Sequence, residues 1–183
     1  WDIWLWISLI FIFFPNAWKQ TRSEEDKKKF LLVFWAAQFF ILSTYSLSGF
    51  GKIYGSIERF FSGDAHAFSI DAAALHISSL LYSMQESTVL GPMIVENPLL
   101  GWIPFVGVIF LQLFSIFIAF KPSLHRVWGL ALVLFHIGTY LSMRAIFVSP
   151  TAILLLLFFN SPFQKEQIPI RQQVLDIPLL GLF

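Results

Sequence analysis

A lysine next to a long apolar segment is the first residue whose chemistry needs an explanation. Lys52 lies in the stretch STYSLSGFGKIYGSIERFF, residues 43–61. A lysine at the end of an apolar helix can extend its amine to a polar surface. Here Gly51 and Gly55 form a small-xxx-small pattern that allows close helix packing, so we expect Lys52 to face protein. Away from water, a lysine can lose its proton and act as a base.

His136 is the second candidate, because it is ionisable and lies well inside the apolar segment 127–143. Ionisable residues in such segments usually face a protein interior or a polar cavity. Thr139 and Tyr140 follow at three and four positions and share its helix face. A structural histidine that donates to a neighbouring carbonyl is the alternative interpretation.

The remaining polar residues give weaker signals. His66 and His76 occur near Asp64 and Asp71, but no pair has the spacing of a known metal site. Arg144 is either an ordinary charge at a turn or a group that binds an anion. The chain has no cysteine, which excludes thiolate metal sites and thiol nucleophiles. We therefore predict no metal.

The amino-acid composition indicates whether these residues act in water or in a membrane. The chain of 183 residues is 57% hydrophobic and 13% charged, and it has 22 phenylalanines. A soluble domain carries about 25% charged residues. The net charge of +1 offers no basic surface for nucleic acid, so we expect no nucleic-acid partner. These values predict an integral membrane protein.

Five apolar segments are separated by polar stretches. The longest uncharged segments can cross a hydrocarbon core of about 30 Å as helices, which rise about 1.5 Å per residue. We predict an all-α bundle of about five transmembrane helices, in one domain at 1–162, with the last two helices forming a hairpin. One long helix kinked near Pro150 is the alternative. Because the sequence begins at Trp1, we expect part of the chain to precede it. The predicted helices cover residues 1–15, 30–50, 98–120, 127–143 and 145–160.

Lysine and arginine fall unevenly on the two sides of this bundle. Cytoplasmic loops of membrane proteins carry an excess of positive charge. If the five helices alternate, nine of the 12 Lys and Arg residues lie on one side, against Lys52, Arg59 and Arg144 on the other. We therefore predict that residues 16–29 are cytoplasmic and that residues 53–97 are extracytoplasmic.

The predicted outer segment contains a helix of its own. Within residues 65–84, Ile70, Ile77 and Leu81 recur at helical spacing, with polar residues opposite. This pattern predicts an amphipathic helix that lies on the bilayer surface or caps the bundle. The tail, residues 163–183, is expected to be cytoplasmic or interfacial.

Two segments resemble one known family. Tyr45-x-x-Ser48-Gly49-x-x-Lys52 resembles the Tyr-x-x-Ala-Gly-x-x-Lys segment in the membrane domain of vitamin K-dependent gamma-glutamyl carboxylases, the HTTM family. The stretch LVLFHIGTYLSMRAIFVSPTAILLLLFF is similar to a later helix of that family, where a Phe-His pair precedes an aromatic residue and another apolar helix. The resemblance covers roughly residues 30–162.

The resemblance implies a reduced quinone of the vitamin K type as cofactor. In the carboxylases, a lumenal lysine deprotonates the reduced vitamin, and the reaction leads to carboxylation of glutamate together with epoxidation of the vitamin. Lys52 matches that lysine and is the candidate catalytic base. His136, Tyr140 and Tyr45 are candidate residues of the quinone pocket. The large lumenal domain of the eukaryotic enzymes has no counterpart here, so the resemblance implies no glutamyl site.

Two other functions stay open. DoxX-like proteins, which also contain a Gly-x-x-Lys element, suggest a quinone- or lipid-binding subunit that passes electrons through a partner. Alternatively, the chain is a non-catalytic structural subunit in which Gly51, Gly55 and the amphipathic segment 65–84 dock into a larger membrane complex. The expected partners are therefore membrane lipids, a quinone and a larger membrane complex.

Overall fold

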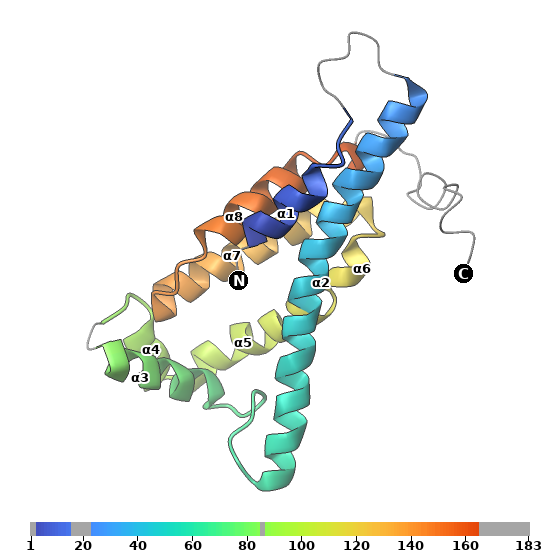
Figure 1. Ribbon diagram of the computed structural model, residues 1–183. Helices are drawn as coiled ribbons and strands as arrows, with labels where there is room; N and C mark the ends of the chain where they lie inside the picture. Colours follow the sequence, from blue (N-terminus) through green and yellow to red (C-terminus); the bar gives the residue numbers. More distant parts are fainter. Residues whose placement is uncertain (1–2, 16–22, 85–86, 165–183) are drawn as a thin grey trace.

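The longest helix, α2 (Glu24–Ser62), connects the two ends of the molecule (Figure 1). The computed structural model describes residues 3–15, 23–84 and 87–164. Every regular element in these ranges is helical, as the all-α prediction requires. Residues 16–22 of the predicted cytoplasmic loop and 165–183 of the predicted tail lie outside the described residues. The other elements are α1 (Ile3–Phe11), α3 (Ala72–Met84), α4 (Gly91–Glu96), α5 (Pro98–Leu113), α6 (Ser115–Ile118), η1 (Pro122–Leu124), α7 (His125–Met143), α8 (Val148–Leu154), the π-helical η2 (Leu155–Phe159) and η3 (Pro162–Gln164).

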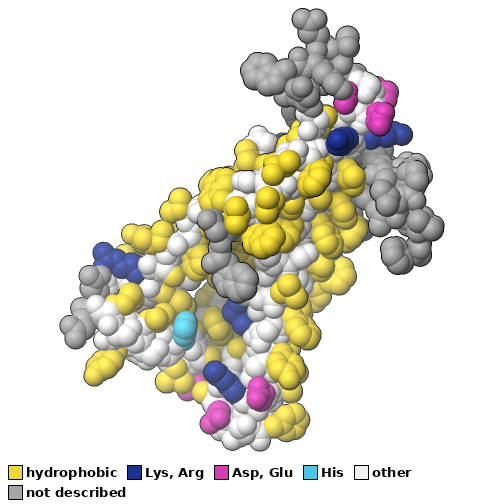
Figure 2. Space-filling view, in the orientation of Figure 1, with side chains coloured by type: hydrophobic (Ala, Val, Ile, Leu, Met, Phe, Trp, Pro, Cys, Tyr) yellow, Lys and Arg dark blue, Asp and Glu magenta, His cyan; other side chains and the backbone are white. Residues whose placement is uncertain are grey.

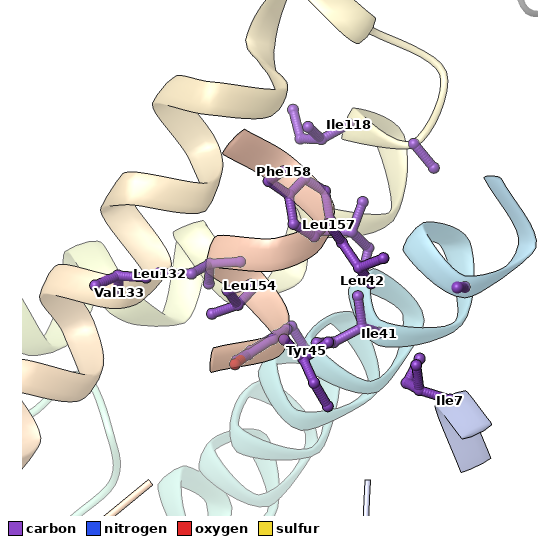
Figure 3. Close-up of a cluster of buried hydrophobic side chains, with 13 residues drawn as sticks. Ile7, Ile41, Leu42, Tyr45, Ile118, Leu132, Val133, Leu154, Leu157 and Phe158 are labelled. Carbon is purple, nitrogen blue, oxygen red and sulfur yellow. The ribbon is translucent and has the colours of Figure 1, made fainter. Parts of the chain in front are cut away.

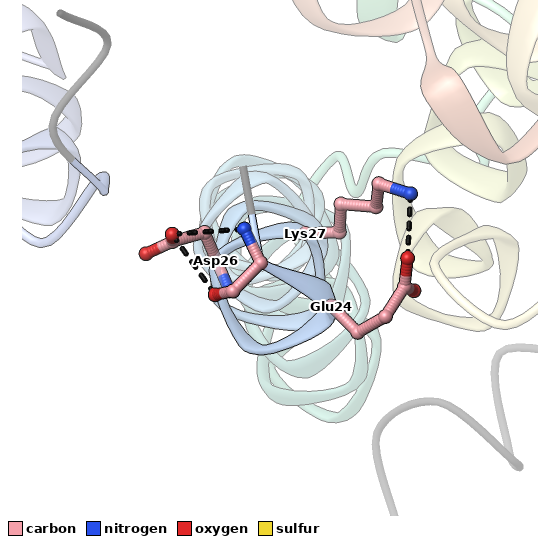
Figure 4. A network of polar contacts seen from close by, with 4 residues as sticks. Glu24, Asp26 and Lys27 are labelled. Atoms are coloured by element: carbon pink, nitrogen blue, oxygen red, sulfur yellow. Dashed lines mark hydrogen bonds and ion pairs between the residues drawn. The ribbon is translucent and has the colours of Figure 1, made fainter. Parts of the chain in front are cut away.

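A capping box starts α2 (Figure 4). The hydroxyl of Ser23 accepts a hydrogen bond from the backbone N–H of Asp26 at 3.1 Å, and the Asp26 carboxylate accepts one from the backbone N–H of Ser23 at 3.3 Å. Lys27 donates to Glu24 at 2.7 Å. The two bonds between Ser23 and Asp26 satisfy backbone N–H groups that a helix start leaves without partners. The helix predicted over 30–50 therefore begins six residues earlier, and residues 24–29 of the segment predicted to be cytoplasmic are helical.

The far end of α2 extends beyond residue 50, where we predicted its end. Serines in this part of α2 bond within the helix, as Ser56 does to the carbonyl of Lys52 at 2.6 Å. Such bonds keep a serine compatible with helix. The helix ends instead at Gly63, whose φ of 75° is left-handed. Glycine adopts that conformation without a steric penalty.

The predicted helix 98–120 is interrupted at Phe114, between α5 and α6. The hydroxyl of Ser46 on α2 accepts a hydrogen bond from the N–H of Ile116 at 2.8 Å and donates to the carbonyl of Leu113 at 3.0 Å. A side chain of another helix thus replaces the backbone bonds that a break removes. The contact explains why one apolar segment forms two helices.

The last two long helices form a hairpin. Arg144, with a left-handed φ of 58°, ends α7, and α8 begins after residue 147. A Cβ atom at Gly129 would lie 2.7 Å from the Cβ of Phe158, so the start of α7 touches the end of η2. The two helices are therefore antiparallel, and the chain does not form one helix kinked at Pro150.

A hydrophobic core fills the half of the molecule that contains the N-terminal part of α2 (Figure 3). Side chains from α1, α2, α7, α8 and η2 point toward one another there, and the dispersion contacts between them stabilise the fold. The largest fully buried side chains of this cluster are Ile7, Ile41, Leu42, Leu132, Ile153, Leu154, Leu157 and Phe158.

The other half contains α3, α4 and α5, which pack on one another beside the C-terminal part of α2 (Figure 1). The predicted amphipathic segment 65–84 forms a helix, α3, only from Ala72. Its residue Ile77 is 1% exposed, and Ala73 is also buried, whereas Ile70 is exposed. Part of the predicted apolar face is therefore covered by the chain itself.

Two helices are long and apolar enough to cross a membrane, by length and composition. These are α2 and the continuous helical stretch Pro122–Met143. The apolar helices α3, α5 and Val148–Phe159 are shorter. Many large apolar side chains lie on the surface, where they form broad patches over α1 and α2 (Figure 2).

Candidate functional site

A stripe of polar and small residues follows one face of α2. Tyr45, Gly49, Lys52, Ser56 and Arg59 are spaced by three or four positions, which places them above one another on a helix. The part of the stripe nearest the core meets α7, and the rest meets α5 and the segment before α3. The candidate site is built along this face.

The Lys52 amine is held by two acceptors. It donates to the Oε1 of Gln112 at 2.8 Å and to the hydroxyl of Ser48 at 2.9 Å. Gln112, on α5, is 3% exposed. Among the described carboxylates, none forms an ion pair with Lys52. A neutral amine has two N–H bonds and one lone pair, so these contacts would leave the lone pair of a neutral Lys52 free to accept a proton.

The glycines around Lys52 play different roles from the one we predicted. A Cβ atom at Gly51 or Gly55 would meet nothing within 4 Å, so no helix packs closely on that pattern. The close contact is at Gly49, where a Cβ atom would lie 2.5 Å from the backbone N of Leu113. Lys52 faces protein, as expected, because Gly49 brings α5 and its Gln112 against α2.

Gly51 and Gly55 line a hollow of about 510 Å³ between α2, α3 and α5, which we call the Lys52 hollow. Figure 2 shows a recess on this face with Lys, Arg and His side chains around it. Because the glycines have no side chains, they leave this space open. The volume lies within the range of about 300–1,000 Å³ that is usual for ligand sites. Its lining residues are Gly51, Lys52, Gly55, Ser56, Arg59, Ala65, His66, Ala67, Ala72, Leu75, His76 and Phe105.

Tyr45 and His136 form a separate buried pair. The Tyr45 hydroxyl and the Nε2 of His136 lie 2.5 Å apart. The rings of Phe135 and Phe147 each lie 4.9 Å from the His136 ring, centroid to centroid. The Nδ1 of His136 has no hydrogen-bond partner among the described residues. The pair therefore joins α2 to α7 inside the protein.

The structure does not unite the predicted pocket residues. Tyr45 and His136 are in contact, but neither lines the Lys52 hollow. Tyr140 is exposed and lines a second hollow of about 330 Å³ with Arg144. The prediction of one pocket containing all these residues is therefore wrong for Tyr140, and Lys52 lies in a different site from His136.

Two buried amides were missed in the sequence. Gln112 holds the Lys52 amine, and the Nε2 of Gln38 donates to the carbonyl of Leu157 at 2.8 Å, in the π-helical η2. Each is the single amide side chain within its predicted helix, 98–120 or 30–50. A search of the apolar segments for polar residues, and not for ionisable residues alone, would have found both.

No metal centre accompanies these groups in the part of the chain that the structure describes. No group of three or more His, Cys, Asp or Glu residues lies close enough there to hold a metal ion. The polar side chains that line the Lys52 hollow carry an amine, a guanidinium, a hydroxyl and two imidazoles, and the amide of Gln112 contacts the amine.

No protein-family model matches the chain, and the comparisons with curated proteins and with solved structures found no match either. The resemblance of Tyr45-x-x-Ser48-Gly49-x-x-Lys52 to the carboxylase membrane domain therefore stays a prediction. The site has to be interpreted from its own geometry.

Proposed function

We propose that this chain is a multi-pass membrane protein with a quinone-type site at Lys52. In this proposal α2 and α7 cross the bilayer, and the shorter apolar helices α1, α5 and α8 lie in the same layer. Two helices of sufficient length and apolarity support it. So do the large apolar side chains on the surface, which in water would be unusual over patches this broad.

The charges at the two ends support the proposed orientation. The α2 start carries Lys27, Lys28 and Lys29, and this end is proposed to be cytoplasmic. Lys52 and Arg59 belong to the opposite half of α2, which is proposed to be extracytoplasmic. With 39 residues, α2 is about 58 Å long at ~1.5 Å per residue, enough to cross the ~30 Å core and to extend beyond it.

One observation carries the proposal of a quinone site: the Lys52 amine lies in the wall of a hollow that is partly apolar. Phe105, Leu75 and several alanines provide apolar surface beside the amine. A quinone ring needs apolar surface and a few placed polar contacts. The donor set fits such a ring, and the Tyr-x-x-Ser-Gly-x-x-Lys resemblance points to the same ligand class.

The residues of the hollow would have distinct roles. A reduced quinone would supply an acidic ring hydroxyl and an oxidisable ring, as in vitamin K-dependent carboxylation and epoxidation. Lys52 would accept the hydroxyl proton on its lone pair. Gln112 and Ser48 would hold the amine in position through its N–H bonds, since both accept from it. Phe105 would flank the ring.

Tyr45 and His136 would act as positioning residues in this proposal. Tyr45 lies seven residues before Lys52 on the same stripe of α2, and His136 lies on α7. Neither residue lines the hollow. Their hydrogen bond fixes the rotation of α2 against α7. That rotation determines which way Lys52 faces.

The test is the quinone content of the purified protein, measured by mass spectrometry of a lipid extract. We expect wild type to retain a quinone and Lys52→Met to lose up to about nine-tenths of it, since one charge-assisted contact is worth about tenfold in affinity. Lys28→Met, an exposed lysine on the same helix, is the matched control. Equal quinone content in wild type and Lys52→Met would contradict the proposal.

The alternative is a structural or lipid-binding subunit of a larger membrane complex, as in the DoxX-like interpretation. The exposed apolar surface that suits lipid also suits another membrane helix. Absence of quinone from wild type, together with stable co-purification of another membrane protein, would favour this alternative.

A further inference from the structure

The part of the Lys52 hollow next to the C-terminal end of α2 is rich in cationic and hydrogen-bond-donating groups. We infer that it binds a phosphate-type anion, with Arg59, His66 and His76 as the binding residues. This site lies beside the proposed quinone ring and does not depend on it. Its ligand is either a soluble phosphate or the phosphate of a lipid headgroup.

The charge of the lining favours an anion. Arg59 gives the lining a positive charge whether or not Lys52 is protonated, and no aspartate or glutamate belongs to it. Glu58 precedes Arg59 in sequence, but it does not line the hollow. Within the described residues, no carboxylate forms an ion pair with Arg59. A guanidinium without such a partner matches two oxygens of a phosphate group.

His66 offers a donor whose ring orientation is fixed. Its Nδ1 accepts a hydrogen bond from the backbone N–H of Phe68 at 3.3 Å. A neutral imidazole that accepts at Nδ1 carries its proton at Nε2. The edge contact with Phe60, at 5.6 Å between centroids, also holds the ring. His66 can therefore donate to an anion in the neutral form and in the protonated form.

A buried serine ties the His66 segment to α2. The Ser56 hydroxyl accepts from the backbone N–H of Ala67 at 3.1 Å and donates to the carbonyl of Lys52 at 2.6 Å. Ser56 is buried. Because Ser56 and Arg59 lie three residues apart on one face, this anchor places His66 on the same side as the guanidinium. The segment that carries His66 is thus held against α2 before any ligand binds.

The experiment uses the purified full chain with two probes. Inorganic phosphate is titrated by calorimetry at constant ionic strength, and phosphatidic acid is counted by native mass spectrometry from phosphatidylcholine nanodiscs. We expect saturable binding of one probe or both, and Arg59→Gln to weaken it about tenfold to a hundredfold. The double variant His66→Asn/His76→Asn is expected to weaken binding as well. Lys28→Gln, at the other end of α2, is the matched control.

A second variant keeps the inference testable if Arg59→Gln does not fold. Gly55→Leu fills the hollow without removing a charge, since a Cβ there meets nothing within 4 Å, and it should also abolish binding. Binding of phosphate alone identifies a soluble anion, and binding of phosphatidic acid alone identifies a lipid headgroup. Absence of saturable binding in wild type, or unchanged binding in Arg59→Gln, overturns the inference. Quinone content is measured on the same samples, so each proposal can fail without the other.

Discussion

The Tyr45–His136 contact shows how single residues set the geometry of this protein. His136 is 6% exposed, and of its two nitrogens only Nε2 has a partner among the described residues. A buried polar group that loses its partner retains the full cost of its removal from water. The sequence indicated that His136 faces polar groups, but it could not show that Tyr45 would satisfy it.

The first prediction concerns this hydrogen bond. Tyr45→Phe removes the hydroxyl and leaves both nitrogens of a buried imidazole without protein partners, so we expect a loss of about 1–3 kcal/mol in the free energy of unfolding. Denaturant unfolding in detergent, followed by circular dichroism, measures the change. Tyr54→Phe is the matched control on the same helix, because Tyr54 is 65% exposed. Equal effects of the two substitutions would refute the structural role of the pair.

At the scale of elements, α2 and α5 are held together at Gly49. The hydrogen bonds that Ser46 and Lys52 make to α5 lie on either side of this glycine. Since a Cβ at Gly49 would meet the backbone of Leu113, helix α5 cannot relieve the clash by moving a side chain. The α2–α5 crossing therefore positions the amide that holds the Lys52 amine.

Gly49→Ala should thus destabilise the protein by about 1–3 kcal/mol, as overpacking of a close contact does. Gly51→Ala, two residues away, should be neutral or stabilising by up to about 1 kcal/mol, because alanine is the better helix former and the space is open. Thermal unfolding of both variants in the same detergent gives the comparison. If Gly49→Ala were as stable as Gly51→Ala, the helices would not meet as described.

The elements also show how far sequence reasoning can go. The apolar segments predicted which stretches are helical, because burial of apolar side chains dominates that choice. Their ends were predicted poorly, since the capping box at Ser23 and the contact of Ser46 at the break after α5 depend on particular hydrogen bonds. The sequence identified Lys52 and His136 as candidate site residues. It could not show that they lie in separate sites, because that depends on which side chains fill the space between the helices.

At the scale of the whole molecule, the distribution of charge matches the proposed orientation. The α2 start with its three consecutive lysines and the hollow with Lys52 and Arg59 lie at opposite ends of one helix (Figure 2). An excess of lysines at one end of a membrane-crossing helix is expected on the cytoplasmic side. Exposed apolar side chains lie between the two groups and also continue past Arg59, at Phe60 and Phe61.

Cysteine labelling tests this arrangement, because the natural sequence has no cysteine to interfere. We expect Asp64→Cys to react with a membrane-impermeant maleimide in intact cells, and Lys28→Cys to react only after the membrane is opened. Both positions are exposed in the structure, so their reactivity reports sidedness and not burial. Labelling of both residues from the same side would contradict the proposed path of α2 through the bilayer.

The central claim is that a quinone ring lies against Lys52, and photo-crosslinking with an azido-quinone tests it most directly. The purified protein is irradiated with the probe, digested and mapped by mass spectrometry, with excess unlabelled quinone as competitor. We expect labelling that the competitor removes, concentrated on α2 near Lys52 and on α5 near Phe105. Labelling spread over the exposed face of α1, or labelling that the competitor does not reduce, would refute a quinone site at Lys52.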